Sequence, residues 1–321
     1  MKYIYEPGSE LSLSQIGLGT GRFGTIVSEE DAFMMMNLFL RKGGNVIDTA
    51  RNYYEWVENG RGKSEACIGK WMSKYNTRDK VCICTKGGVR NEGKKWYIDL
   101  SKKTLLDELN QSLATLQTDY IDIYLLHRDE KERNVGEIIE NLNFLKEQGN
   151  ISCIGVANWS TDRIIEANKY ADAHSLCPIQ VIQTWWSLAE YTKEMWNDEN
   201  TTHMDEQMYQ YMLKKSILGM AYTSQCKGYF QKKKLGDEYV SDLLRKRIET
   251  DTNKRKAQFI SEYCDNNDIT PTEMVLGYIT SNPINGIALV SCSNEKQLYD
   301  VLEHCDYIMP QNVIDKIDSI C

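Results

Sequence analysis

The chain has 321 residues, of which 41% are hydrophobic and 26% are charged, and its 46 acidic and 38 basic side chains leave a net charge of −8. This acidic balance argues against nucleic acid or an anionic membrane surface as the main partner, and no stretch approaches the 18 uncharged apolar residues that would predict a membrane span. The N-terminus, MKYIYEPGSELSL, lacks the apolar region of a signal peptide, so we expect a soluble, cytoplasmic protein.

Cysteine usage agrees with a reducing compartment. Ten cysteines are scattered from Cys67 to Cys321 without a CxxC pair. A zinc site needs four convergent ligands, and none of the four histidines lies beside a cysteine in ligand spacing. We therefore expect small buried thiols and no metal.

Short β-branched runs alternate with helical patterns along the chain, after an expected hairpin at residues 2–5 and 11–14. The runs that predict strands lie at residues 15–18, 45–50, 80–86, 121–127, 152–158, 180–186, 219–225 and 286–291. Helical patterns lie at residues 28–44, 63–75, 100–117, 135–150 and 161–174, the first with Ser28 as its N-cap. This order predicts an α/β fold, a (β/α)8 TIM barrel over residues 1–321 as one domain, with the short N-terminal β-hairpin and a C-terminal helix.

An open, doubly wound sheet is the alternative fold. The first expected strand runs into GLGTGRFG, which contains G-x-G-x-x-G at Gly19, Gly21 and Gly24, the phosphate turn of dinucleotide-binding sheets. In those folds a helix opens at the third glycine, whereas here Thr25 to Val27 precede the Ser28 cap. The number of strands also favours the barrel.

Two segments interrupt the alternation. Residues 188–204 form an expected polar and aromatic loop after the sixth strand, and residues 228–255, which follow the seventh, are dense in charge. The second segment is either a solvated helix or a mobile lid over a ligand. Both segments follow the C-terminal ends of strands, where barrels hold their active sites.

Four polar residues fall at the ends of successive expected strands. Asp48, Lys86 and His127 end the second, third and fourth, and Tyr53 follows Asp48 by five residues. A phenol with a pKa of about 10 is a poor acid at neutral pH, but a nearby ammonium lowers that pKa and a carboxylate holds the ammonium in place. Tyr53 could then exchange a proton with a carbonyl or alcohol oxygen that His127 orients. Such a site still needs an electron source, which a nicotinamide would supply.

The chain resembles the aldo-keto reductase family along nearly its whole length. The motifs that carry the resemblance are, in order, GLGTGRFG, VIDTARNY with GKSEACIGKW, CTKGG, DYIDIYLLHRDE, ISCIGVANWS, IQTWWSL, AYTSQCKGYF and SCSNEKQL. The resemblance implies a barrel that binds NAD(P)(H) across its C-terminal mouth. It also implies a catalytic tetrad of Asp48, Tyr53, Lys86 and His127, and it selects Tyr53 over Tyr54 as the catalytic phenol.

The same resemblance implies how the cofactor is held. Gly19, Thr20, Gly21 and Arg22 would pass under the nicotinamide end, beside Asp48. Asn158 and Gln183 would bind the carboxamide, and Trp186 would stack on the ring. The residues implied for the pyrophosphate and for the adenosine ribose are Thr223, Ser224, Gln225, Lys227, Ser291, Ser293 and Gln297. Many relatives place Arg or Lys where Ser291, Ser293 and Gln297 stand, so we expect NADP(H), which the family favours, with NAD(H) as the alternative.

The sequence says less about the substrate than about the cofactor. Side chains expected near it are Tyr54, Trp56, Trp96, Arg128 and Trp159, with Trp185 and Trp196 in neighbouring loops. Aromatic rings suit sugar faces or aromatic carbonyls, and a sugar-type aldehyde or alcohol is our expectation. The leading hypothesis is a reversible carbonyl/alcohol oxidoreductase. The alternatives are a catalytically slow, nicotinamide-binding regulatory or redox-sensing subunit, and an unrelated barrel lyase or isomerase. The natural substrate, the physiological direction and the oligomeric state are not readable from the sequence.

Overall fold

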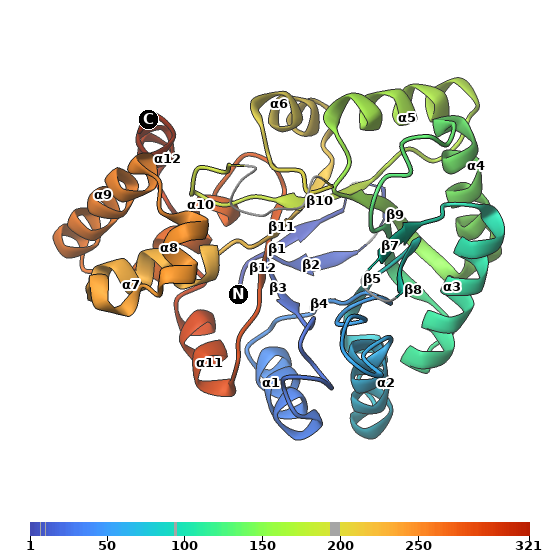
Figure 1. Ribbon diagram of the computed structural model, residues 1–321, viewed down its shortest axis with the longest axis horizontal. Helices are drawn as coiled ribbons and strands as arrows, with labels where there is room; N and C mark the ends of the chain where they lie inside the picture. The colour runs from blue at the N-terminus through green and yellow to red at the C-terminus, as the bar shows by residue number, and fades with distance from the viewer. Residues whose placement is uncertain (7, 10, 93–94, 193–199) are drawn as a thin grey trace.

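A computed structural model describes residues 1–6, 8–9, 11–92, 95–192 and 200–321. Within these ranges eight parallel strands close into a barrel in the order β10-β11-β12-β3-β4-β5-β8-β9 (Figure 1). The strands are β3 (Ile16–Gly19), β4 (Val46–Asp48), β5 (Cys82–Gly87), β8 (Ile121–Leu126), β9 (Ile151–Ala157), β10 (Val181–Trp185), β11 (Leu218–Tyr222) and β12 (Gly286–Val290). The expected (β/α)8 barrel is confirmed.

Helices surround this barrel. Those that follow the first six barrel strands are α1 (Glu29–Arg41), α2 (Lys63–Tyr75), α3 (Lys102–Leu116), α4 (Val135–Leu145), α5 (Thr161–Ala173) and α6 (Glu206–Lys215). Ser28, the expected N-cap of α1, accepts a hydrogen bond from the Asp31 N–H. Among the described residues, none of the helices combines the length and the apolar character that crossing a bilayer requires.

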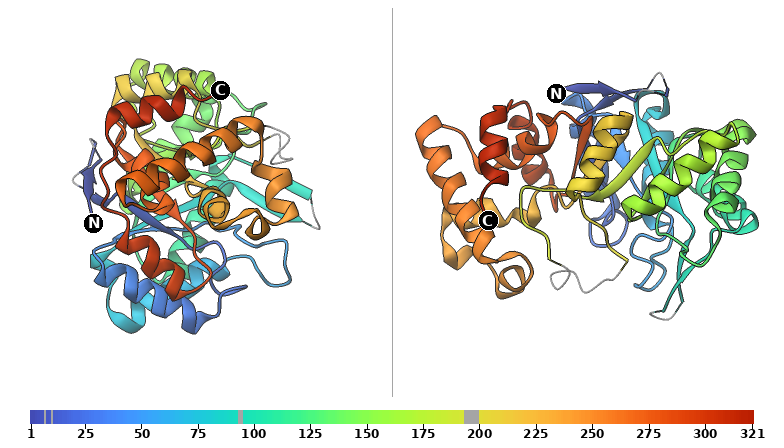
Figure 2. Two further views of the ribbon diagram at one scale, coloured as in Figure 1. Left: turned by 90° about the vertical axis from the view of Figure 1, so that its left-hand side faces the viewer. Right: turned by 90° about the horizontal axis from the view of Figure 1, so that it is seen from above.

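The N-terminal hairpin, β1 (Tyr3–Tyr5) and β2 (Ser12–Ser14), lies across the end of the barrel opposite the carboxyl ends of its strands (Figure 2). Leu13 packs fully buried against apolar side chains that point into the barrel, including Val46 and Leu218. A second and larger apolar layer fills the space between the strands and the helices. The hairpin therefore closes the end of the barrel at which the strands begin, and the carboxyl ends of the strands form the open face.

The charge-dense segment after β11 is helical. It forms α7 (Tyr229–Leu235), α8 (Asp242–Ile248) and the start of α9 (Asp251–Asn267), followed by α10 (Pro271–Thr280). Tyr229, Phe230, Leu244 and Ile248 are at most 5% exposed, so these helices bury an apolar face and are not simply solvated. The C-terminal helices α11 (Glu295–Glu303) and α12 (Gln311–Asp318) complete the wall.

Some strand ends and one hairpin differ from the sequence-based expectations. The seventh barrel strand ends at Tyr222 because Thr223 takes a left-handed backbone conformation (φ 55°), and the sixth ends at Trp185. A second hairpin, β6 (Val89–Glu92) and β7 (Lys95–Ile98), follows β5 and was not expected. Gly24 has φ 71° and no helix opens there, which removes the basis of the doubly wound alternative.

Candidate active site

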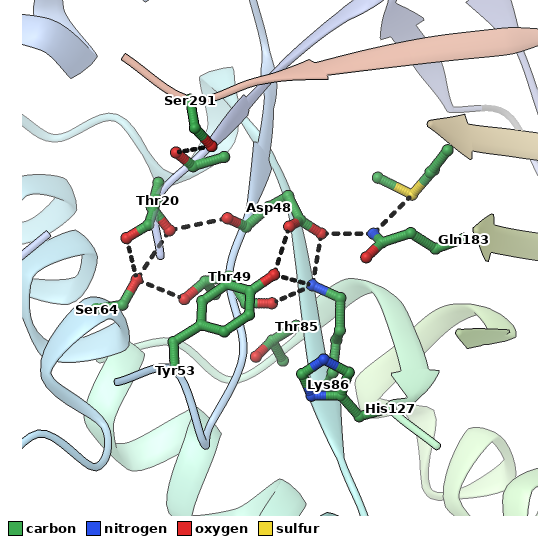
Figure 3. Close-up of polar contacts among 12 residues, drawn as sticks. Thr20, Asp48, Thr49, Tyr53, Ser64, Thr85, Lys86, His127, Gln183 and Ser291 are labelled. Carbon is green, nitrogen blue, oxygen red and sulfur yellow. Dashed lines mark hydrogen bonds and ion pairs between the residues drawn. The ribbon is translucent and has the colours of Figure 1, made fainter. Parts of the chain in front are cut away.

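Three of the four expected catalytic side chains meet at the mouth of the barrel (Figure 3). The Lys86 ammonium donates to Asp48 Oδ1 at 2.7 Å, to the Tyr53 hydroxyl at 2.8 Å and to the Thr49 carbonyl at 2.7 Å. The Tyr53 hydroxyl donates to Asp48 Oδ2 at 2.9 Å. Asp48 ends β4 and Lys86 lies on the adjacent strand β5, so the parallel register brings the two together.

Burial decides the electrostatics of this group. Lys86 is fully buried and Asp48 is 3% exposed. Burial alone would lower the pKa of Lys86, but the Asp48 carboxylate and the Tyr53 hydroxyl raise it overall, so the ammonium stays charged. Burial and the Asp48 charge raise the pKa of Tyr53 by more than Lys86 lowers it. The expected net lowering is therefore wrong for this state: Tyr53 keeps its proton at neutral pH and is placed to give it away.

His127, which follows β8, lies beside Tyr53 with ring centroids 5.8 Å apart. Burial and the charges of Lys86 and Arg128 hold its pKa well below the usual range, so the imidazole is neutral. Its Nδ1 is 2.7 Å from Asn52 Oδ1. The orientation of the Asn52 amide decides which ring nitrogen of His127 carries the proton. An amide oxygen at Nδ1 calls for Nδ1–H, whereas the amide turned by 180° would leave Nε2–H as the donor. Asn52 was not identified from the sequence.

The two expected carboxamide ligands occupy the opposite side of the mouth. Gln183, on β10, donates from Nε2 to Asp48 Oδ1 at 2.8 Å, and Asn158 Oδ1 accepts from the Tyr222 hydroxyl at 2.7 Å. Tyr222 ends β11 and is half-buried. It was not identified from the sequence, because it lies in the middle of the expected strand segment, residues 219–225, and not at its end.

Trp186 does not lie at the mouth. It is 4% exposed, and its ring faces Gly219 and Gly286, where an added Cβ would approach it to 3.4 and 2.9 Å. Met212 of α6 borders the same space at Gly219, so the ring fills the layer between strands and helices. This position is wrong for the expected stacking on the nicotinamide, because Gln183 points into the lumen and alternation along the strand then puts Trp186 on the outer side.

Two other side chains that were expected to contact the cofactor form hydrogen bonds with backbone carbonyl groups instead. Thr20 is fully buried and its hydroxyl donates to the Asp48 carbonyl at 2.8 Å. Ser224 is also fully buried and its hydroxyl donates to the Leu289 carbonyl at 2.6 Å. Both side chains hold the backbone of the site together, so neither hydroxyl is available to a ligand in this geometry.

The expected substrate contacts divide into two groups. Tyr54, Trp56 and Trp96 form a chain of neighbouring rings, with centroids 4.8 and 6.1 Å apart. Trp159 is fully buried and therefore offers no surface to a substrate, and Trp185 is 2% exposed. Arg128 is half-buried beside His127. Its neighbour Asp129 pairs with Arg163 at 3.3 Å, and Trp196 lies outside the described residues.

A groove of about 660 Å³ runs beside this mouth, between the ends of β11 and β12. The expected cofactor residues that line it are Arg22, Thr223, Ser224, Gln225, Lys227, Ser291, Ser293 and Gln297. Arg22 donates to Ser293 Oγ at 3.2 Å. It therefore lies in the groove beside Ser293, whereas it was expected at the nicotinamide end of the cofactor. Gly21 is beneath the Tyr53 ring, and an added Cβ would stand 3.6 Å from it.

Lys227 carries the most perturbed charge in the groove. Lys227 is exposed to solvent on one side, but partial desolvation on the other and the nearby Arg247 and Arg22 guanidinium groups lower its pKa to about 8. Lys227 and its neighbour Cys226 have φ values of 56° and 49°, a left-handed conformation that costs non-glycine residues of order 1–3 kcal/mol each. A strained turn that holds several cations together is a suitable site for an anion.

The sequence model of the Aldo/keto reductase family matches residues 15–321. The chain belongs to this family. It is similar to Protein tas of Escherichia coli K12, at 27% identity over 345 residues that cover 100% of this chain and 97% of the relative. It is also similar to norsolorinic acid reductase B of Dothistroma septosporum (32% over 196 residues, 57% of this chain and 48% of the relative). A third relative is the aldo-keto reductase YhdN of Bacillus subtilis (28% over 244 residues, 75% and 66%).

Membership of the aldo/keto reductase family shows an oxidoreductase of small molecules that acts in carbonyl reduction, and the family generally uses NAD(P)H. The cations Arg22, Lys227 and Lys232 that line the groove suit the phosphates of such a dinucleotide. Within the described part of the chain, the buried Oε1 of Gln231, which lines the groove, has no hydrogen-bond partner. A buried acceptor of this kind suits a bound polar group.

Proposed function

We propose that this aldo/keto reductase reversibly reduces an aldehyde or ketone to an alcohol, with Tyr53 as the general acid and base. The hydroxyl of Tyr53 carries the proposal, because it keeps its proton at neutral pH and lies 2.8 Å from the buried Lys86 ammonium. A nicotinamide cofactor, when bound, supplies the hydride.

The residues around the phenol have separate tasks in this proposal. Tyr53 donates its proton to the substrate oxygen, and Lys86 stabilises the phenolate that remains. Asp48 keeps Lys86 charged and in place at 2.7 Å. His127 is neutral and borders the same space. It would donate from Nε2–H to the substrate oxygen when the Asn52 amide turns its nitrogen toward Nδ1. In the oxidation direction Tyr53 takes the proton back.

We also propose which residues hold the dinucleotide. Gln183 and Asn158 are placed for the carboxamide, and Tyr222, whose hydroxyl contacts Asn158, replaces Trp186 as the ring beside the nicotinamide. Gly19, Gly21 and the backbone of Thr20 would lie beneath it. Lys227, Thr223 and Gln225 would bind the pyrophosphate, and Arg22, Ser291, Ser293 and Gln297 the adenosine ribose and its phosphate.

NADP(H) is the cofactor that we propose, with NAD(H) as the alternative. Arg22, Lys227 and Lys232 line the groove, and a phosphate monoester at the ribose would be attracted by these cations. Asp300, which was not singled out from the sequence, lines the same groove. Its carboxylate suits a free ribose hydroxyl and so keeps NAD(H) open.

Titration with NADPH and NADH, followed through tryptophan fluorescence, tests the cofactor directly. Trp185 stands opposite Tyr222 in the strand register, so binding at the mouth should quench part of the emission. We expect saturable quenching by both nucleotides, with the lower Kd for NADPH, and oxidation of the bound cofactor when an aldehyde is added. Absence of binding of either nucleotide, checked by calorimetry, would remove the proposal.

The pH dependence of cofactor binding tests Lys227. Its pKa of about 8 means that the phosphate-binding ammonium is lost as the pH rises through that value. The Kd for NADPH should therefore increase about tenfold between pH 7 and pH 9, a range in which the cofactor phosphates keep their charge. The Lys227→Arg variant stays protonated and should bind with a nearly flat profile. An equally steep profile in that variant would show that another group is titrating.

The thiols support a cytoplasmic location. All ten cysteines are free, and the only exposed one is Cys321. Free thiols persist in reducing compartments.

A further inference from the structure

Three aromatic side chains leave the mouth of the barrel as a connected row. Tyr54 and Trp56 lie on the loop after β4, and Trp96 lies on strand β7 of the hairpin that follows β5. The ring centroids of Tyr54 and Trp56 are 4.8 Å apart, and those of Trp56 and Trp96 are 6.1 Å apart. Trp56 is 55% exposed and Trp96 is 47% exposed. The row is thus open to solvent, unlike the buried tryptophans of this chain such as Trp71.

The row is carried by two segments that follow candidate catalytic residues in the sequence. Tyr54 is the residue after Tyr53, and the β6–β7 hairpin begins three residues after Lys86. The loop after β4 and the hairpin therefore both follow segments that carry candidate catalytic side chains. Figure 2 shows the loop and the hairpin at the same end of the barrel. The loop and the hairpin that carry the row therefore border the same face of the barrel as the Tyr53 hydroxyl (Figure 2).

Polar contacts connect the loop after β4 to the β6–β7 hairpin. Arg61 pairs with Glu55 on the loop and with Glu108 of α3 at 2.8 Å. The second oxygen of Glu108 accepts from the Gly88 N–H, at the base of the hairpin, at 2.6 Å. The loop itself is tight, because an added Cβ at Gly60 would stand 1.9 Å from the Tyr54 carbonyl oxygen. The rings are consequently held in position before any ligand arrives.

The hairpin has two different faces, and Trp96 lies on the inner one. Alternation along β7 puts Trp96 on the same side as Ile98, whose cross-strand partner Val89 is 4% exposed. Lys95 and Tyr97 lie on the other side, where the ammonium is 5.2 Å from the ring centroid. The hairpin therefore directs Trp96 toward Trp56, and Tyr97 provides an aromatic residue of similar exposure on the opposite face.

We propose that Tyr54, Trp56 and Trp96 form a platform that binds the ring system of a planar aromatic aldehyde or ketone while its carbonyl reaches Tyr53. This inference rests on the proposed carbonyl reduction. A sugar would also stack on such rings, but sugar recognition needs hydrogen-bonding groups at the ring edge. Among the described residues of the loop after β4, Arg61 and Glu55 pair with each other. The platform therefore favours an aromatic substrate over the sugar-type substrate expected from the sequence.

The test compares substrates of increasing ring area. The wild-type protein should show kcat/KM rising from propanal through benzaldehyde to 2-naphthaldehyde. Trp56→Leu and Trp96→Leu should each lower kcat/KM for 2-naphthaldehyde about 3- to 10-fold, mainly through KM, and leave propanal within about twofold. Calorimetry with 2-naphthalenemethanol, the product alcohol, should show the same loss of affinity, a readout that does not require turnover.

Tyr97→Leu is the matched control, because it removes an exposed ring from the outer face of the same hairpin. This variant should behave as the wild type with all three aldehydes. Equal losses in Tyr97→Leu and Trp96→Leu, or unchanged kinetics in both Trp variants, would overturn the platform. A larger loss for glyceraldehyde than for 2-naphthaldehyde would assign it to sugars instead. Absence of turnover of every aldehyde by the wild-type protein would instead contradict the proposed function itself.

Discussion

Replacing Tyr53 with phenylalanine should lower kcat for carbonyl reduction by about 10²- to 10⁴-fold, the usual contribution of a general acid. The phenylalanine ring keeps the packing over Gly21 but has no proton to give. The Kd for NADPH should change by less than about twofold, because the phenol serves the proton step and not the groove. Steady-state kinetics together with the fluorescence titration would measure both quantities in one preparation.

The control for this variant is Tyr97→Phe, which removes a hydroxyl on the outer face of the β6–β7 hairpin and should retain full activity. Wild-type turnover in Tyr53→Phe would contradict the role of the phenol. A wild-type protein that binds NADPH but reduces carbonyls no faster than Tyr53→Phe would instead favour the regulatory or redox-sensing subunit.

Removing the charge of Lys86 should have the largest effect on stability. In Lys86→Met the Asp48 carboxylate, which is 3% exposed, keeps the hydrogen bonds from Tyr53 and Gln183 but loses its counter-ion. Breaking a buried ion pair in this way costs about 3–5 kcal/mol. We expect the free energy of unfolding, measured by urea denaturation, to fall by that amount and carbonyl reduction to be lost.

The double variant Asp48→Asn/Lys86→Met separates the two effects. Because no uncompensated charge remains in the barrel, it should recover much of the free energy of unfolding while reduction stays absent. A single Lys86→Met variant as stable as the wild type would show that Asp48 and Lys86 are not a buried pair of opposite charges.

The convergence of the candidate catalytic residues could be predicted from the sequence because of a property of parallel barrels. The carboxyl ends of neighbouring strands meet at one face, so Asp48 on β4 and Lys86 on β5 had to lie close together whatever the details of packing. The same reasoning placed His127 after β8. For these residues a correct strand assignment was sufficient, and an error of one residue at a strand end did not matter.

Residues beyond the strand ends depend on local turns, and there the sequence was a poorer guide. Gln183 of β10 points into the lumen, so alternation along the strand directs the ring of Trp186, three residues later, into the layer outside the strands. Thr20 faces inward because its hydroxyl satisfies the Asp48 carbonyl. The β6–β7 hairpin was missed because its short strands lie in a connection where the alternation of strand and helix predicted only a loop.

The bond between Gln183 and Asp48 has a mechanical consequence. In the ring of strands, β10 and β4 are diametrically opposite, so this 2.8 Å contact crosses the lumen instead of following the wall. Hydrogen bonds between neighbouring strands resist shear around the circumference, whereas a crossbar resists a change of diameter. The carboxylate that aligns Lys86 and Tyr53 is thus braced from the far wall, and the placement of the phenol depends on a strand that it does not touch.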